Sequence, residues 1–181
     1  QPSEDGQVYL VTPGIYNDAH LDGWRAVTDA VPETDGRVVI QLMHMGRVSH
    51  PQNTPHGRQA VAPSAVAPAS PMFTASGMQS IPEPRELSTD EVRGVVEEFR
   101  LAARAAIAAG ADGVEIHAAN GYLLQQFLSS NANQRTDEYG GSIANRIRLS
   151  VQMAAALTDE IGAGPTSIRV CTLSGLGDSV E

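Results

Sequence analysis

Three side chains suited to acid–base and hydrogen-bonding chemistry, His117, Asn120 and Tyr122, lie close together in the sequence. They follow residues 113–116, which we predict to be a strand, with His117 at its carboxyl end. Neutral hydrogen-bond donors placed side by side can hold a carbonyl oxygen and stabilise negative charge that develops on it. A phenol nearby can supply a proton to a carbanion or an enolate. The pattern therefore indicates a site that binds and protonates a carbonyl compound.

Each of these residues also has a structural interpretation. His117 fits a core histidine with satisfied hydrogen bonds, Asn120 a helix cap, and Tyr122 a packing residue. Their gathering at one strand end favours function, because catalytic groups collect at the carboxyl ends of strands in barrel enzymes. On the residues alone, both interpretations remain open.

Two further polar residues, Gln41 and Arg169, interrupt apolar strands predicted at residues 38–42 and 168–171, the first of them a buried strand. A buried amide or guanidinium is costly unless it is paired. Both side chains could meet a planar, hydrogen-bonding and partly anionic cofactor, or they could pair with a carboxylate such as Glu115. The sequence leaves this choice open.

A metal site is not predicted. His44 and His50 flank a short segment with no carboxylate or cysteine nearby, and their spacing matches no compact zinc pattern. The single cysteine, Cys171, excludes a disulfide framework and a cysteine-based zinc site. At a strand end, a cysteine is more often a small buried hydrophobe than a nucleophile. This cysteine usage fits a reducing compartment, and we expect a cytoplasmic protein.

Apolar periodicity predicts the elements that position these residues. Helical spacing covers residues 20–31, and a second helix begins at Ser88, which forms a capping box with Glu91, and ends at Gly110. Residues 44–86 are irregular and hold most of the eleven prolines; we interpret them as a structured excursion with short strands, against the alternative of a flexible linker between two domains. The other expected elements are a short helix at 122–128, a polar loop at 130–141 that orients a capped helix, and that helix at about 143–161.

Alternation of strands and helices predicts an α/β protein with a parallel sheet, forming a single domain over residues 1–181. An open doubly wound sheet and a closed (β/α)₈ barrel both fit this order. Neither a G-x-G-x-x-G motif after a strand nor a G-x-x-x-x-G-K-[ST] motif is found, which favours the barrel.

The net charge and the hydropathy of the chain limit the kinds of binding partner that we expect. The net charge of −9 argues against nucleic acid and against anionic membrane surfaces. No apolar run of about 18 residues is present, so a membrane span is not expected. The chain has no recognisable signal peptide and starts at Gln1, from which we expect that the natural N-terminus lies upstream. An oligomer remains possible.

Several motifs, in order along the chain, resemble the Old Yellow Enzyme family of flavin-dependent ene-reductases. The resemblance runs from about Gln7 to Arg169, and its most specific stretch is Asn133 to Ser142, NQRTDEYGGS, continuing to Asn145 and Arg146. The other segments that carry it are Tyr9 with Pro13-Gly14-Ile15-Tyr16, Gly23-Trp24, Gln41-Leu42-Met43-His44, Gly46-Arg47-Val48-Ser49-His50, Val61-Ala62-Pro63-Ser64, Asp112 to His117, and Asn120-Gly121-Tyr122-Leu123-Leu124.

The resemblance implies a flavin mononucleotide (FMN) at the mouth of a (β/α)₈ barrel, of which this chain carries the middle part. It implies hydride transfer from NADPH or NADH, through the flavin, to the activated C=C bond of a small enone or enal. By match, Gln41 hydrogen-bonds the flavin ring and Arg169 lies near the ring's N1 and C2 oxygen, where a positive charge stabilises the reduced anion. His117 and Asn120 bind the substrate carbonyl, His117 also contributes to the flavin site, and Tyr122 delivers the proton.

The chain departs from the family at Val8, where glycine is usual, at Pro32-Glu33-Thr34-Asp35, and at Val170-Cys171-Thr172. The family's first strands and its phosphate-binding strands are expected outside this stretch, so the isolated chain is expected to bind flavin poorly. Two alternatives remain: a non-catalytic partial barrel, either a truncated remnant or an assembly module, and a related dienoyl-CoA reductase. The single cysteine argues against an iron–sulfur cluster within this stretch.

Overall fold

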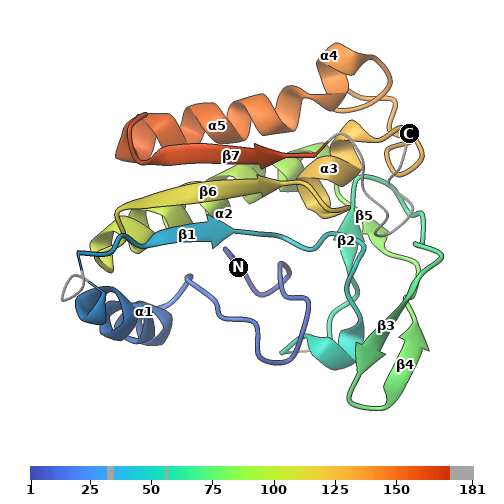
Figure 1. Cartoon of the computed structure of the whole chain (residues 1–181). Helices are drawn as coiled ribbons and strands as arrows, with labels where there is room; N and C mark the ends of the chain where they lie inside the picture. The colour runs from blue at the N-terminus through green and yellow to red at the C-terminus, as the bar shows by residue number, and fades with distance from the viewer. Residues whose placement is uncertain (32–34, 56, 172–181) are drawn as a thin grey trace.

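A parallel three-stranded sheet forms the centre of the molecule (Figure 1). The structure is a computed structural model and describes residues 1–31, 35–55 and 57–171. β6 (Gly113–Ala118) lies between β1 (Val39–Leu42) and β7 (Thr166–Val170), and both neighbours run parallel to it. Parallel neighbours require crossover connections, which here contain the helices α2 (Thr89–Ala108) and α5 (Arg148–Ile161). The strand–helix alternation predicted from the sequence is confirmed.

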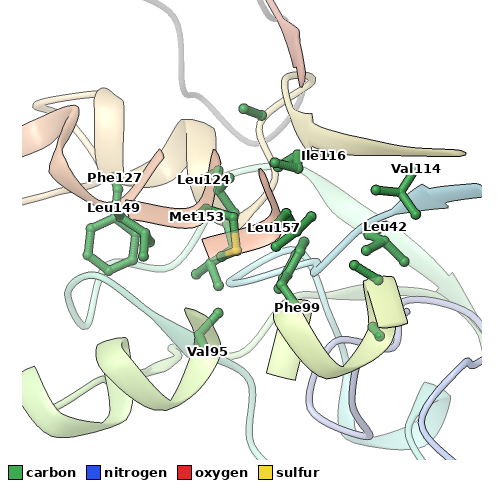
Figure 2. Close-up of a cluster of buried hydrophobic side chains, with 14 of the residues drawn as sticks. Leu42, Val95, Phe99, Val114, Ile116, Leu124, Phe127, Leu149, Met153 and Leu157 are labelled. Atoms are coloured by element: carbon green, nitrogen blue, oxygen red, sulfur yellow. The ribbon is translucent and has the colours of Figure 1, made fainter. Parts of the chain in front are cut away.

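The main core lies between one face of this sheet and helices α2 and α5. Alternate strand residues point to opposite faces, and the residues of β1 and β6 that meet the helices are buried and apolar. Figure 2 shows side chains of this core, among them Leu42 and Ile116 from the sheet, Phe99 from α2, and Met153 and Leu157 from α5. The two helices are also joined by an ion pair between Arg104 and Glu160, at 2.5 Å. Strands and helices are therefore held as one unit, and the loops at the carboxyl ends of the strands extend from it.

The opposite face of the sheet is open in the described chain. Val39 is 57% exposed, and Gln41 and Arg169 are exposed as well. The prediction of a buried strand at residues 38–42 is therefore wrong for alternate residues, because helices cover only one face of the sheet and burial alternates along β1. The strand also starts one residue later than predicted, since the Val38 N–H donates to the Asp112 carboxylate at 2.8 Å.

The long excursion between β1 and α2 is structured. It contains the short helix η2 (Pro51–Asn53), a parallel pair of β2 (Val61–Ala62) with β5 (Arg85–Glu86), and an antiparallel hairpin of β3 (Pro71–Thr74) with β4 (Gly77–Ser80). The short strands expected there are present, and in Figure 1 they lie beyond the carboxyl end of β1. The excursion therefore contributes walls at the end of the sheet where the three polar side chains are expected.

The helices agree with their sequence signals, with shifts at the ends. The capping box of α2 is confirmed: Ser88 accepts from the Glu91 N–H, and the Glu91 carboxylate accepts from the Ser88 N–H. α1 (Asp18–Ala30) begins two residues earlier than predicted because Asn17 caps it; Pro32 lies outside the described residues. The helix predicted at 143–161 is two, α4 (Ile143–Arg146) and α5, divided at Ile147. No helix in the described chain is long and apolar enough to cross a membrane.

Gly94, in the interior of α2, offers a test of the packing on that helix. It is exposed, and a Cβ added there meets no described atom within 4 Å. Glycine in a helix interior costs about 0.5–1 kcal/mol relative to alanine, because the unfolded glycine has more conformational freedom to lose. We expect Gly94→Ala to raise the free energy of unfolding by that amount, measured by urea titration. A loss of stability would show that another part of the protein packs on this face of α2.

Candidate active site

The open sheet face carries the polar residues singled out in the sequence. Residues that are opposite one another in adjacent parallel strands share a face, and the register pairs Gln41 with Glu115 and His117 with Arg169. Gln41, His117 and Arg169 thus lie on one face, on three adjacent strands. His117 is within β6, which runs two residues further than predicted, to Ala118.

Glu115 is the hydrogen-bond partner of Gln41. The Gln41 amide donates from Nε2 to Glu115 Oε1 at 2.5 Å, across the β1–β6 pair. The sequence left open whether Gln41 meets a cofactor or pairs with a carboxylate, and in the structure it is paired with the Glu115 carboxylate. Both side chains belong to the uncovered sheet face, and Gln41 is exposed there.

His117 is buried, and its hydrogen bonding defines which nitrogen carries the proton. Nδ1 accepts from the Ala119 N–H at 3.2 Å, so the proton of the neutral ring is on Nε2. Burial lowers the pKa of His117, and the positive charge of Arg169 lowers it further, against a smaller opposite effect of Glu115. The ring is consequently neutral at neutral pH, with Nε2–H available as a donor.

Asn120 sits in a sharp turn between β6 and α3 (Leu123–Leu128). Its φ is 57° and that of Gly121 is 80°, so both lie in the left-handed region, which asparagine and glycine tolerate best. The Tyr122 N–H donates to the Ala119 carbonyl at 3.2 Å and closes the turn. Non-glycine residues in this conformation cluster at functional sites, where surrounding structure holds them. The turn brings Asn120 and Tyr122 back over the end of β6.

Tyr122 contacts His117 directly. The two rings meet edge to face, with centroids 5.0 Å apart and planes at 68°. The ring of Tyr122 also packs against a small apolar cluster of Val8, Met45, Met72 and Ile81. Burial raises the pKa of the Tyr122 phenol, and the nearby Tyr9 adds to the shift. The phenol is therefore protonated at neutral pH and can act as a proton donor.

Two buried glutamines next to this turn were not singled out in the sequence. Gln125 accepts from the Gly121 N–H at 2.6 Å, and its Nε2 donates to the Cys171 carbonyl. Gln126 is fully buried and donates to the carbonyls of Gly121 and Met45 at 2.8 and 3.0 Å. The signal that could have revealed them is a pair of adjacent amides inside the apolar helix LLQQFL, since a buried amide must find partners.

His44 and His50, the two histidines considered as metal ligands, have structural roles. His50 caps η2 by accepting from the Gln52 N–H at 3.1 Å, and His44 accepts from the Gly46 N–H at 3.0 Å. The described residues contain no group of three or more histidine, cysteine or carboxylate side chains that could hold a metal ion. Cys171 is half-buried directly after β7, not fully buried as a small core residue would be.

His44 predicts a pH dependence of stability. Its burial lowers its pKa from 6.5 to about 4, so folding favours the neutral ring. As pH falls from 6.5 to 4, the His44 imidazole becomes protonated in the unfolded chain but stays largely neutral in the folded chain. We expect the free energy of unfolding to fall over this window by about 3 kcal/mol from this residue.

Urea titrations at several pH values between 6.5 and 4 test this expectation. His44→Asn keeps an acceptor for the Gly46 N–H without a titrating group, so its stability should vary less with pH. Glu91 and Glu160, whose pKa values arginine partners lower from 4.5 to about 2, begin to lose their contribution near pH 4.5, but this loss is common to both proteins and cancels in their comparison. An equal pH dependence in both proteins would contradict the assignment.

The motif at residues 133–146 is structural, as predicted. The Arg135 guanidinium is buried and donates to the Pro63 carbonyl at 3.0 Å, to the Leu87 carbonyl and to the Asp137 carboxylate. This arginine lowers the pKa of Asp137. Ser142 caps α4 by accepting from the Asn145 N–H. The motif ties the excursion to the loop before α4.

The open face fits a planar, hydrogen-bonding and partly anionic group. Gln41 supplies an amide, Arg169 a positive charge, and Val39 an exposed apolar surface beside them. His117, Asn120 and Tyr122 stand at the carboxyl end of the same face. The three strands do not by themselves provide the loops that bind phosphate in barrels, which usually follow the seventh and eighth strands.

Parallel strands, crossover helices and a polar site at the carboxyl ends of the strands fit part of a (β/α)₈ barrel. Residues 1–181 match the sequence profile described as the NADH:flavin oxidoreductase / NADH oxidase family. The chain belongs to this family.

Relatives and solved structures agree with this assignment. The chain is 42% identical over 180 residues to a putative 12-oxophytodienoate reductase 5 of Oryza sativa subsp. japonica (99% of this chain, 47% of the relative). It is 44% identical over 173 residues to a probable flavin mononucleotide-dependent alkene reductase of Leishmania infantum (93% and 47%). The structure of an Old Yellow Enzyme homologue from Zymomonas mobilis superposes with a TM-score of 0.95 at 37% identity, over 99% of this chain and 50% of that one.

Morphinone reductase in complex with tetrahydroNAD superposes with a TM-score of 0.90 at 42% identity, over 97% of this chain and 50% of that one. The resemblance to the Old Yellow Enzyme family and the (β/α)₈-barrel fold are thereby confirmed. The chain spans about half the length of the relatives that it matches.

Proposed function

We propose that the protein containing this chain is an FMN-dependent ene-reductase that reduces the activated C=C bond of small enones or enals with NADPH or NADH. The observation that carries the proposal is the end of β6. There a neutral His117 with its proton on Nε2, a turn held in a left-handed conformation at Asn120 and a protonated Tyr122 follow one another within one short connection. Names of relatives that mention alkene and oxophytodienoate reduction support the same chemistry.

In this proposal His117 and Asn120 both donate to the carbonyl oxygen of the substrate. Their donation polarises the conjugated system and makes the β-carbon electron-poor. When hydride adds there, the C=C electrons move toward the carbonyl, and the two donors stabilise the resulting enolate oxygen. The lowered pKa of His117 matters because a neutral imidazole with a fixed tautomer is a donor of constant geometry.

Tyr122 completes the reduction by giving its phenolic proton to the α-carbon. The raised pKa of the phenol keeps that proton in place until a carbanionic carbon is available to take it. Contact with the ring of His117 keeps the two side chains at the same end of the sheet. His117 and Asn120 thus act on the carbonyl oxygen, and Tyr122 acts on the α-carbon of the same substrate.

The flavin, when bound, supplies the hydride that it has received from the nicotinamide. Gln41 and Arg169 are the residues of this chain that would hold the polar edge of its ring. The positive charge of Arg169 favours a ring that becomes anionic on reduction. Glu115 accepts from Gln41 Nε2, which leaves the amide oxygen as the acceptor that a ring N–H would use.

The test is an anaerobic absorbance experiment on the protein loaded with FMN. We expect the visible flavin band to bleach with NADPH and to return on addition of 2-cyclohexenone, with cyclohexanone as the product. A band that bleaches but does not return with the enone would show a flavin reductase of another substrate class. A protein that binds no flavin under any condition would favour the non-catalytic partial barrel.

A further inference from the structure

Gln126 forms hydrogen bonds to two loops at the carboxyl end of the sheet. Its amide lies in the first turns of α3, which Figure 1 places at the carboxyl end of the central sheet. From there Nε2 donates to the carbonyl of Gly121, in the turn that contains Asn120, and to the carbonyl of Met45, in the loop after β1. Oε1 accepts from the Arg47 N–H at 3.0 Å. A single buried side chain therefore bonds to both loops.

The surrounding structure is shaped to the Gln126 amide. Gly46 has a φ of 59°, and a Cβ at that position would overlap the atoms of the amide. The Leu123 N–H donates to the His44 carbonyl at 3.0 Å, which adds a backbone bond between the same two segments. Both N–H donors of the amide are used, and a fully satisfied buried polar group specifies one arrangement of its neighbours.

We propose that Gln126 is a positioning residue of the active site: its buried amide fixes the Asn120 turn against the loop that follows β1, and so sets where the carbonyl donors lie relative to the flavin face of the sheet. This role rests on the proposed function. Gln126 touches neither the substrate nor the reacting atoms and acts through Gly121. Reacting groups misplaced by about 1 Å can lose about 10²-fold in rate, so the loss of this bridge has a large expected effect.

Asn133 is a matched control. Its buried amide has the same kinds of partner as that of Gln126. Nδ2 donates to the carbonyls of Phe127 and Tyr139 at 2.7 and 2.8 Å, and Oδ1 accepts from the Arg135 N–H at 3.1 Å. It holds the loop before α4 and has no bond to the Asn120 turn. Substitution by leucine or by the corresponding acid removes the amide N–H donors at either position. At position 126 the loss affects the Asn120 turn and the loop after β1, and at position 133 it affects the loop before α4.

The first measurement is hydrogen exchange of the flavin-loaded protein, which needs no turnover. Gln126→Leu and Gln126→Glu are expected to accelerate exchange in peptides covering residues 45–47 and 121–123. Asn133→Leu and Asn133→Asp are expected to accelerate it around residues 135–139 instead. Unchanged exchange at 121–123 in both Gln126 variants would overturn the proposal.

The second measurement separates positioning from general destabilisation. Protein reduced with dithionite is mixed with 2-cyclohexenone or with dioxygen, which oxidises reduced flavin without needing carbonyl donors. Gln126 variants should lose about 10- to 100-fold in the enone reaction and retain the dioxygen reaction. Asn133 variants should retain both. An equal loss of the enone rate in the Asn133 variants would overturn the proposal.

Gln126→Glu adds a pH signature. The ionised carboxylate has no donor for the Gly121 and Met45 carbonyls, whereas the protonated acid regains one. Burial raises the pKa of such a carboxyl group, so the enone rate of this variant, relative to wild type, should rise as pH falls. If the wild-type protein does not react with the enone but the Gln126 variants still show accelerated exchange at 121–123, the positioning role is supported and only the proposed function is overturned.

Discussion

Tyr122→Phe is expected to lower the rate of enone reduction by about 10²- to 10⁴-fold, the usual contribution of a general acid. The phenol is the proton donor in the proposed reaction, and its raised pKa keeps it protonated throughout the neutral range. The carbonyl donors are untouched, so the loss should appear in kcat and little in KM. Anaerobic mixing of the reduced protein with 2-cyclohexenone measures this rate directly.

The matched control is Tyr139→Phe, which removes a phenol elsewhere in the protein. Tyr139 OH donates to Gln152 Oε1 at 2.9 Å and lies outside the site, against Phe127. Its loss should cost about 1 kcal/mol in the free energy of unfolding, the net value of one hydrogen bond, and leave kcat unchanged. If Tyr122→Phe keeps the wild-type rate with the enone, another group donates the proton and the assigned role of Tyr122 is wrong.

The second large effect is expected for Asn120→Gly. Removal of one of two donors to a developing oxyanion costs about 10²- to 10³-fold in kcat. Glycine is the informative substitution because Asn120 has a φ of 57°, a conformation that glycine adopts freely and alanine does not. The variant therefore removes the amide while leaving the turn unstrained, and its stability should be at least that of wild type.

Asp35 supplies the comparison for Asn120, since it is the other non-glycine residue with positive φ in the described chain, also at 57°. Asp35→Gly relieves the same backbone conformation far from the β6 turn and should leave enone reduction unchanged. Stability by urea titration and kcat with 2-cyclohexenone are measured for both variants. A similar fall in kcat for Asp35→Gly, or none for Asn120→Gly, would contradict a role of Asn120 as a carbonyl donor.

Local signals in the sequence predicted most of the fold. The apolar stripe after Ser88 and its pairing with Glu91 predicted α2 and its capping box, because helical periodicity and capping depend on residues only a few positions apart. Ends were less well predicted: tertiary hydrogen bonds moved the start of β1 to Val39, and the division at Ile147 had no sequence signal.

The candidate site was predicted in part. His117, Asn120 and Tyr122 are neighbours in sequence, so a turn after a strand suffices to gather them. The partner of Gln41 was left open, because Glu115 is brought to it by strand register and not by sequence distance. Gln126 was missed, since its three partners become neighbours only when the loop after β1 meets the turn after β6.

By itself the sequence determined the order of strands and helices, the residues able to do carbonyl chemistry, and the family resemblance. Only the tertiary structure decided which face of the sheet is open, which nitrogen of His117 carries the proton, and which side chain joins the two loops. The reason is physical: secondary structure and turn chemistry follow from short-range sterics and hydrogen bonding, whereas burial, protonation and partner choice depend on groups distant in the chain.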